Sequence, residues 1–426
     1  MNEWLMWLLT AAISFASGAL VVQYLTAHPV RMSGYLLGSA VTFFALAVLL
    51  GTQYKGGERA LAIALSLVLA LAGYAVLTHR VLAREDTRPV PELVRSPEDP
   101  GLGHTAVVYF THGEPETYDP IGWINQFREF DEQKILFVPK LVRLFFLYRL
   151  RQSYLTVGKS DHRKMHQQML ASLENAFRSQ GDMDTRFYLS FLDDDPRPDA
   201  AVIQALNDGA SRIIVSEVFL TISNHTAEGK ELIEEVGCEQ YGVEVQYTGP
   251  LWDSETLRSM FLQRVSRHLG VADKSEVGVL LVGHGQPDEW DVEWATETEQ
   301  EQSFRTSVLD LFEADGYRRE SLSQAWMEFK EPKPAEKILE FSRDGVKKVF
   351  YFSAAISADA IHSQYDVPEL VRQAPVGDEI ELVNLGAWNN DPIVIAAIKE
   401  KIDSVMAPCR QQARFAPIGG PHLHTA

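Results

Sequence analysis

The chain has 426 residues, enough for more than one domain, and its 58 acidic against 39 basic side chains give a formal net charge of −19. The charge is uneven, because residues 1–90 hold six basic and four acidic side chains and the remainder holds 33 and 54. An acidic main part argues against a nucleic-acid partner. Two cysteines exclude a disulfide framework and cannot supply the four ligands of an iron–sulfur cluster.

Three long runs without a charged side chain open the sequence. They are Trp4–Leu25, Met32–Tyr54 and Ala60–His79, with 22, 23 and 20 residues. Each is about as long as a helix needs to cross the roughly 30 Å hydrocarbon core of a bilayer. A single run of this kind could be a signal peptide, but three in series cannot. We therefore predict that residues 1–84 form an anchor of three transmembrane helices, with the lipid bilayer as a partner.

Basic residues flank the three runs unequally. Lys55 and Arg59 lie on one side of the predicted membrane, and five arginines lie on the other, namely Arg31, Arg80, Arg84, Arg88 and Arg95. Since flanks rich in Lys and Arg stay in the cytoplasm, we predict a multi-pass protein of the inner cell membrane with everything after Arg80 in the cytoplasm. Residues 85–103 are rich in proline and charge, and they are predicted to form a linker.

A short apolar run that ends in a glycine–histidine turn occurs twice. Val279–Val282 leads into Gly283, His284 and Gly285, with a proline at 287. The stretch 106–115 repeats the pattern around His112. Apolar runs closed by glycines are typical of buried parallel strands, and open α/β sheets keep their ligands at the carboxyl ends of such strands. The pattern predicts a duplicated domain with one histidine at the end of a strand in each half.

The rest of the sequence supports the duplication. Arg212–Leu220 and Lys348–Ile356 both read as strands, and they are 136 residues apart. His225 and His362 follow them, 137 residues apart. Strand–helix alternation predicts an α/β fold of two tandem doubly wound parallel-sheet, Rossmann-like halves, at residues 104–270 and 271–408. A tail at 409–426 is predicted to be disordered.

The first half is longer than the second, because the two glycine–histidine turns are 172 residues apart. The extra residues are placed at about 134–165, in a basic and apolar segment. On a helix starting near Pro139, the side chains of Lys140, Arg143 and Arg151 share one face. Such a helix suits a membrane interface or the lip of a pocket for an apolar anion. The alternative is a core helix whose basic ends reach solvent.

Residues 105–406 resemble the class II tetrapyrrole chelatases, which include protoporphyrin ferrochelatase and the sirohydrochlorin chelatases. The turn at His284 looks like the H-G-x-P turn that carries the catalytic histidine of ferrochelatases. Trp123–Arg151 is similar to the ferrochelatase lip over the porphyrin, and Ser357–Val367 falls where that family has its S-D-H-I-E-x-x-Y motif. The resemblance implies the two-half fold predicted above.

The second motif departs from the ferrochelatase pattern. Ala360 stands where ferrochelatases have a histidine, and His362 where they have a catalytic glutamate. His362, Asp366 and Pro368 instead look like the H-x-x-x-D-x-P motif of the sirohydrochlorin enzymes. The lip therefore resembles one branch of the superfamily and the histidine motif resembles the other.

The resemblance implies a site for metal insertion. His284 and His362 are the expected catalytic base and metal ligands, because imidazole titrates near neutrality and binds Fe²⁺ and Co²⁺. Glu328 is a further expected metal ligand, and Asp366 is expected to orient His362. His112 and His225 would form a paired site in the first half. The expected macrocycle lip consists of Lys140, Arg143, Tyr148 and Arg151.

These inferences predict a membrane-anchored, ferrochelatase-like enzyme that inserts a divalent metal, Fe²⁺ first, into a porphyrin-type tetrapyrrole. The metal and the tetrapyrrole are substrates, and no tightly bound cofactor is expected. Two alternatives stay open at this point. One is a sirohydrochlorin cobalt or iron chelatase, and the other is a carrier that binds tetrapyrrole or metal at the membrane without catalysis.

Overall fold

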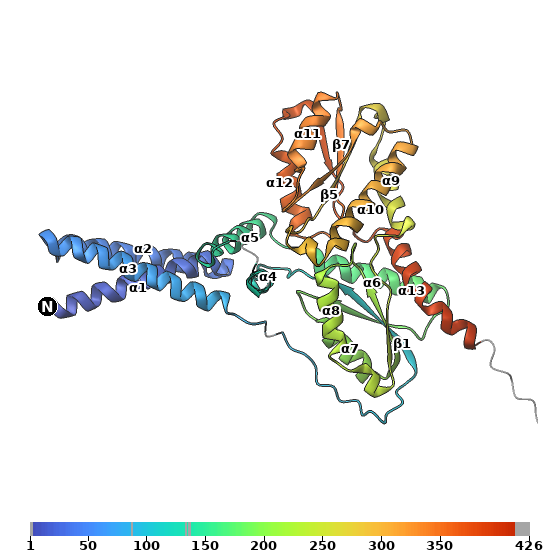
Figure 1. Ribbon diagram of the computed structural model, residues 1–426, viewed down its shortest axis with the longest axis horizontal. Helices are drawn as coiled ribbons and strands as arrows, with labels where there is room; N and C mark the ends of the chain where they lie inside the picture. Colours follow the sequence, from blue (N-terminus) through green and yellow to red (C-terminus); the bar gives the residue numbers. More distant parts are fainter. Residues whose placement is uncertain (1–2, 87, 133, 135–137, 414–426) are drawn as a thin grey trace, which may run out of the picture. The chain divides into compact units, whose positions relative to one another are not determined.

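The computed structural model describes residues 3–86, 88–132, 134 and 138–413. The chain forms two compact units (Figure 1). The helical unit comprises Met1–Thr87 and Pro115–Ser160, and the α/β unit comprises Arg88–Glu114 and Asp161–Ala426. The helical unit is therefore built from two separate stretches of chain.

Three helices of the helical unit are long and apolar enough to cross a membrane: α1 (Glu3–Thr26), α2 (Pro29–Thr52) and α3 (Gly56–Leu82). Their outer faces expose large apolar side chains such as Phe44 and Leu71. Helices α1 and α3 cross closely, since a Cβ atom at Gly18 would lie 1.8 Å from the carbonyl oxygen of Ala70. Small residues at such a crossing are typical of helices packed in lipid.

The second stretch of the helical unit packs on the ends of these helices. It contains α4 (Ile121–Glu132), the 3₁₀ turn η1 (Lys140–Val142) and α5 (Leu144–Val157). The predicted helix start near Pro139 is wrong. The amide of Val142 donates to Pro139 O and that of Arg143 to Lys140 O, so this turn closes in 3₁₀ rather than α geometry.

The α/β unit contains two four-stranded parallel sheets, which confirms the predicted fold class. The first has the order β2-β1-β3-β4 and the second β6-β5-β7-β8. The strands are β1 (His104–Thr111), β2 (Arg186–Phe191), β3 (Ala210–Glu217), β4 (Glu244–Tyr247), β5 (Val277–Gly283), β6 (Leu322–Trp326), β7 (Lys348–Ser353) and β8 (Glu381–Asn384). The central strands β1 and β5 are almost wholly buried, as their unbroken apolar runs require.

Helices connect successive parallel strands, as in a doubly wound fold. The first half has α6 (His162–Ser179), α7 (Pro198–Asn207), α8 (Asn224–Glu234) and α9 (Glu255–His268). The second has α10 (Ala295–Ala314), α11 (Pro334–Arg343), the π-helical turn η6 (His362–Asp366), α12 (Val367–Arg372) and α13 (Pro392–Ala413). Short 3₁₀ turns are η2 (Cys238–Tyr241), η3 (Lys274–Glu276), η4 (Trp290–Val292), η5 (Arg319–Ser321) and η7 (Gly377–Glu379).

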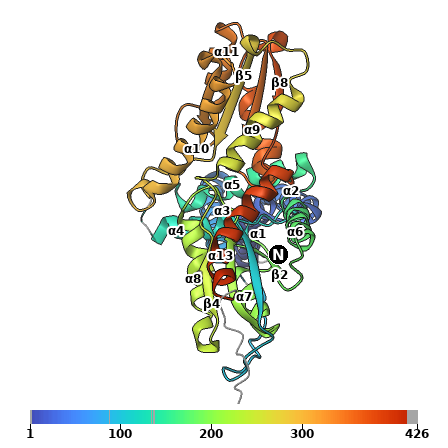
Figure 2. The same ribbon diagram turned by 90° about the vertical axis from the view of Figure 1, so that its right-hand side faces the viewer.

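The last helix joins the two halves. Helix α13 packs on α6, α9 and β3, which all belong to the first half; Figure 2 shows this helix in red. One apolar core runs through both halves and includes Val107 of β1, Val279 of β5 and Ile398 of α13. The strand ends of both halves are thereby held in a single unit.

The predicted linker and the predicted disordered tail differ from the prediction in different ways. The described residues of the linker at 85–103 form no helix or strand, yet Arg95 among them is buried and donates to Ala210 O at 2.5 Å. Helix α13 covers residues 409–413 of the predicted disordered tail. The rest of that tail, 414–426, lies outside the described residues.

Candidate functional site

The two glycine–histidine turns have the same local structure. His112 directly follows β1 and His284 directly follows β5. Each imidazole Nδ1 lies close to the carbonyl oxygen of the next glycine, at 2.9 Å for His112 and 2.8 Å for His284. Because a carbonyl only accepts, Nδ1 carries the proton and Nε2 is the basic nitrogen. The turn therefore sets the tautomer of both histidines.

The residue after His284 has to be a glycine because the backbone of Glu328 lies against it. Gly285 has φ +82°, and a Cβ atom there would lie 2.5 Å from the carbonyl oxygen of Glu328. The amide of Glu328 in turn donates to His284 O at 3.0 Å. The residues that follow β5 and β6 are thus bound to each other. This contact brings the backbone of Glu328 next to that of His284.

His362 reaches His284 from the π-helical turn after β7. The two ring centroids are 5.5 Å apart, and the rings are nearly perpendicular at 79°. His362 Nδ1 lies 2.8 Å from Asp366 Oδ2. The π turn, rather than an α-helical turn, brings this carboxylate to the ring. Asp366 therefore fixes the orientation of His362 in the way that carboxylates orient metal-binding histidines.

The two histidines have opposite electrostatic surroundings. Burial alone would lower the pKa of His362, but the hydrogen bond and charge of Asp366, with Glu328 and Glu114, raise that pKa to about 9. Burial and the charge of His362 lower the pKa of His284. At neutral pH His284 is the neutral base and His362 the cation. A metal that binds His362 has to displace a proton.

A second histidine pair repeats the first. His112 and His225, which is in the first turn of α8, have ring centroids 4.6 Å apart at 77°. Burial lowers the pKa of His225 strongly, and the charges of His112 and His284 lower it further. His112 and His284 also act on each other electrostatically. The four imidazoles therefore lie in one region of the α/β unit, and two of them, His112 and His284, follow the equivalent strands β1 and β5.

Two carboxylates that support the site were not predicted. Glu114, in the first-half turn, accepts the amide of Ile361 at 2.9 Å and so ties that turn to the segment of His362. Glu301 of α10 accepts the amide of His284 at 3.0 Å. Glu301 is buried beside Arg305, whose guanidinium lies 3.9 Å from the centroid of the Trp326 ring. The position of Glu114 inside the H-G-x-P pattern was the available sequence signal.

No group of three or more His, Cys, Asp or Glu side chains is close enough to hold a metal ion within the described ranges. His284 and His362 supply two imidazoles, and Glu328 adds charge that raises the pKa of both. Two imidazole nitrogens next to a carboxylate can bind a divalent metal with few enough ligands for a substrate to take it over. The assignment of His284, His362 and Glu328 as metal ligands stays a prediction.

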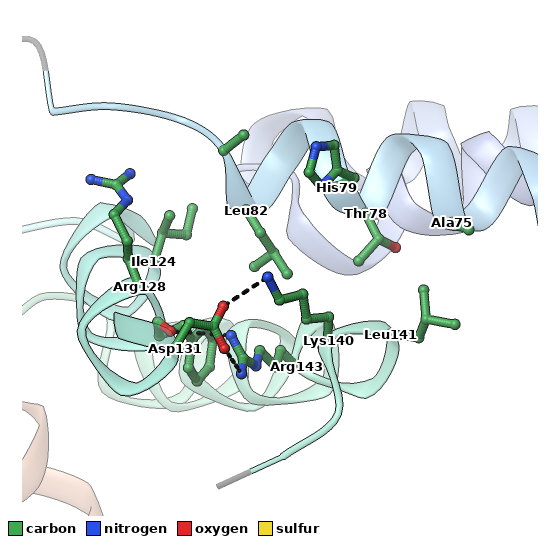
Figure 3. A pocket seen from close by; sticks show the side chains of 12 residues that line it. Ala75, Thr78, His79, Leu82, Ile124, Arg128, Asp131, Lys140, Leu141 and Arg143 are labelled. Carbon is green, nitrogen blue, oxygen red and sulfur yellow. Dashed lines mark hydrogen bonds and ion pairs between the residues drawn. The ribbon is translucent and has the colours of Figure 1, made fainter. Parts of the chain in front are cut away.

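The four predicted lip residues lie in the helical unit. Figure 3 shows the Asp131 carboxylate between Lys140, at 2.9 Å, and Arg143, at 2.5 Å, beside a cavity of about 350 Å³. Arg143 is only 4% exposed and Arg151 is fully buried. Arg151 donates to the carbonyl oxygens of Tyr24 and Ala27 at the end of α1.

Tyr148 completes this arrangement. The Arg151 guanidinium lies 5.0 Å from the centroid of the Tyr148 ring and 5.3 Å from that of Tyr24. The structure therefore uses the two arginines to bind parts of the helical unit together, as in the core-helix alternative. A macrocycle-lip role for Lys140, Arg143, Tyr148 and Arg151 stays a prediction.

The two histidine pairs lie next to parallel strands of two linked α/β halves, an arrangement suited to binding a divalent metal. Residues 104–406 match the ferrochelatase family model. The chain belongs to the ferrochelatase family, and it is a metal chelatase.

Solved structures of low sequence identity also align with the chain. SirB from Bacillus subtilis with Fe³⁺ is 16% identical, has a TM-score of 0.46, and covers 72% of this chain and 98% of its own. CbiX, described as the terminal enzyme for biosynthesis of siroheme in denitrifying bacteria, is 12% identical with a TM-score of 0.41, and it covers 71% and 98%. No protein of curated function matches the chain significantly in sequence.

Proposed function

We propose that the protein is a membrane-anchored tetrapyrrole chelatase that inserts Fe²⁺ into a porphyrin-type macrocycle. The observation that carries the proposal is the contact between His284 and His362, with Asp366 bound to the second ring. Insertion needs a base for the two pyrrole N–H protons and a ligand that releases the metal. A neutral and a charged imidazole side by side provide these two functions.

In this mechanism His284 takes up one pyrrole proton at Nε2, because its Nδ1 proton is held by Gly285 O. His362 would lose its proton to solvent on binding the metal, and after passing the metal on it would take up the second pyrrole proton, while Asp366 keeps its ring in place. Glu328 attracts the cation and compensates for charge that develops on His284. Fe²⁺ is a divalent metal of the borderline kind that imidazole binds well.

Membrane anchoring is the second part of the proposal. Three helices have the length and apolar composition of membrane spans, and arginines are more numerous at one end of them. By the excess of positive charge, the α/β unit lies on the cytoplasmic side of the inner cell membrane. A porphyrin-type substrate is apolar, so an enzyme at the bilayer surface meets it where it partitions.

Two alternatives keep specific support. His362, Asp366 and Pro368 resemble the sirohydrochlorin motif, and SirB is a sirohydrochlorin chelatase solved with cobalt. That alternative makes sirohydrochlorin the substrate and Co²⁺ or Fe²⁺ the metal. The carrier alternative rests on Ala360 and on the histidine that replaces the catalytic glutamate of ferrochelatases.

The deciding experiment is anaerobic incubation of the purified full chain with Fe²⁺ or Co²⁺ and either protoporphyrin or sirohydrochlorin, followed by absorbance. We expect His284→Ala and His362→Ala each to lower insertion at least about a hundredfold, the scale of a lost general base or ligand. Asp366→Asn should lower it less, and macrocycle binding should survive in all three. His268→Ala, at the end of α9, is the matched control.

Each outcome selects one alternative. Insertion into sirohydrochlorin alone would identify the substrate of the other branch. Tight macrocycle binding by the parent without insertion of either metal would establish the carrier. Parent-level insertion by both histidine variants would place the catalytic site elsewhere.

A further inference from the structure

The helical unit contains a second cavity, of about 660 Å³, at one end of its three long helices. Its lining includes three arginines, Arg31, Arg80 and Arg84, and one acidic residue, Asp119. The wall also has apolar and aromatic side chains, among them Leu77, Tyr35 and Tyr118. A volume of this size accommodates a small organic molecule. The mixture of cationic and apolar groups favours an amphipathic anion.

The three arginines are available for a ligand. Among the residues that the structure describes, none of their guanidiniums has a hydrogen bond or ion pair, and all three residues are exposed. Two neighbouring arginines already bind the free carbonyls nearby. Arg151 donates to Tyr24 O and Ala27 O, and Arg128 donates to Arg84 O at 2.6 Å. The pocket arginines are therefore not needed to cap helix ends.

The local backbone adds to the positive potential. Helix α2 is 24 residues long and begins at Pro29, next to the cavity. The amide of Val30 reaches only His28 Nδ1, at 3.4 Å. The N-terminal end of a long helix carries partial positive charge. The single carboxylate, Asp119, accepts the amide of Ile121 at 3.1 Å, so its charge is directed to the start of α4.

We propose that this cavity binds the phosphate of an anionic phospholipid, with the arginines on the head group and the apolar wall against the glycerol and the first acyl carbons. The proposal rests on the membrane anchoring proposed above. The cavity lies where α1 and α3 end and α2 begins, which is the level of lipid head groups if these helices span the bilayer. Guanidinium groups bind phosphate in a bidentate manner. An apolar wall beside the cations distinguishes a lipid from free phosphate.

The test uses the full-length protein in phosphatidylcholine nanodiscs that contain a small fraction of spin-labelled phosphatidylglycerol or, in parallel, spin-labelled phosphatidylcholine. We expect a larger immobilised fraction for the anionic label. The combined variant Arg31→Gln, Arg80→Gln and Arg84→Gln should weaken that preference at least about tenfold, since three charge-assisted contacts are lost. The combined lysine variant at the same positions should keep most of it.

The matched control is the combined variant Lys55→Gln, Arg59→Gln and Arg149→Gln. It removes the same three charges from the helical unit outside the cavity, and it should leave the preference unchanged. Inorganic phosphate and protoporphyrin are added as competitors. Equal immobilisation of both labels, equal loss in the control, or full displacement by inorganic phosphate would overturn the lipid site. Displacement of the label by protoporphyrin, with loss of porphyrin binding in the glutamine variant, would make the cavity a macrocycle site instead.

Alkaline extraction of membranes separates this proposal from the anchoring on which it rests. A chain that alkali releases from membranes would refute the anchoring as well. A chain that resists extraction and shows no lipid preference would refute the lipid site alone. If the glutamine variant does not fold, the comparison of the two labels on the parent still decides between preference and no preference.

Discussion

Two histidines of similar burial differ in charge because only one of them has a carboxylate bound to its ring. His362 contacts Asp366, whereas the Nδ1 of His284 contacts a neutral carbonyl. The pKa of the first is raised to about 9 and that of the second is lowered. The pair thus carries one positive charge at neutral pH.

Asp366→Asn should lower the pKa of His362 towards the ordinary value of 6.5, because the hydrogen bond and charge of Asp366 are the largest contributions that raise it. A raised folded-state pKa stabilises the protein fully below about 6.5, and this contribution is lost as the pH rises through about 9. The parent should therefore lose more stability than the variant over this window. NMR titration of the imidazole resonances, with thermal unfolding at each pH, measures both effects. An unchanged His362 pKa in the variant would contradict the assignment.

Sequence alone could identify the residues with a local signal. His284, His362 and Asp366 stand in short patterns next to predicted strands. Because the carboxyl ends of parallel strands lie at the same edge of a sheet, these residues are expected to lie close together. Glu114 also stands inside the first H-G-x-P pattern, but its contact with the segment of His362 could not be identified in this way. Its carboxylate accepts an amide 247 residues further along the chain. No periodicity or spacing encodes such a contact.

At the scale of elements, the end of β5 needs a glycine at position 283, because a side chain there would collide with Glu301. A Cβ atom at Gly283 would lie 1.9 Å from Glu301 Oε1, the carboxylate that accepts the amide of His284. Gly278 lies in the same strand, and there an added Cβ would meet only side-chain atoms at 3.3 Å. The two glycines therefore provide a matched comparison within one element.

Gly283→Ala should displace Glu301, disturb the turn of His284 and destabilise the protein by about 1–3 kcal/mol, the range for overpacking. Insertion should fall more than stability alone explains, because His284, the proposed base, moves. Gly278→Ala should cost less and leave insertion per folded molecule unchanged. Thermal unfolding and the absorbance assay give the two readouts. Equal behaviour of the variants would show that the Glu301 contact does not position His284.

The link between α5 and α1 depends on one buried arginine. Arg151→Ala removes the donor to Tyr24 O and Ala27 O and the cation beside two tyrosine rings. We expect a loss of about 2–3 kcal/mol in stability, the scale of hydrogen bonds from a charged group. Arg149→Ala, on the exposed side of α5, should change little. Reduced macrocycle binding at unchanged unfolding temperature would instead favour the lip role.

The strands were easier to predict than the helical insertion, for a physical reason. Parallel strands buried on both faces must be continuous apolar runs, and glycines mark their ends. A basic amphipathic segment shows only that two faces differ, and it does not show what each face contacts. Arg143 and Arg151 were therefore compatible with a lip or a core, and the 3₁₀ turn at Lys140–Val142 had no sequence signal.

At the scale of the whole molecule, the helical unit is inserted into the first half of the α/β unit. The residues that flank this insertion, Glu114 and Asp161, contact the same short segment of the second half. Glu114 accepts the amide of Ile361 at 2.9 Å, and the amide of Asp161 lies 3.2 Å from Gln364 Oε1. The chain therefore leaves and re-enters the α/β unit beside one short segment.

Joining residues 88–114 to 161–413 through a short glycine–serine linker should give a folded, monodisperse protein without detergent. Its two sheets and common core are complete within these residues. Deleting residues 1–90 alone should behave worse, because Tyr118 and Arg151 then lose their partners at the end of α1. Size-exclusion chromatography and circular dichroism compare the two. A well-behaved 1–90 deletion that aggregates once 115–160 is also removed would contradict the division into units.

The discontinuous helical unit has a consequence for proteolytic shedding. The chain passes between the two units three times, near residues 87, 114 and 160. A protease that cuts the proline-rich segment at 85–103 severs only one of these passages. If the three long helices span a membrane as proposed, the α/β unit then stays held there through the packing of residues 115–160 on α1 and α3. A single cleavage in the linker would leave this non-covalent contact in place, whereas a protein held by one linker alone would be released.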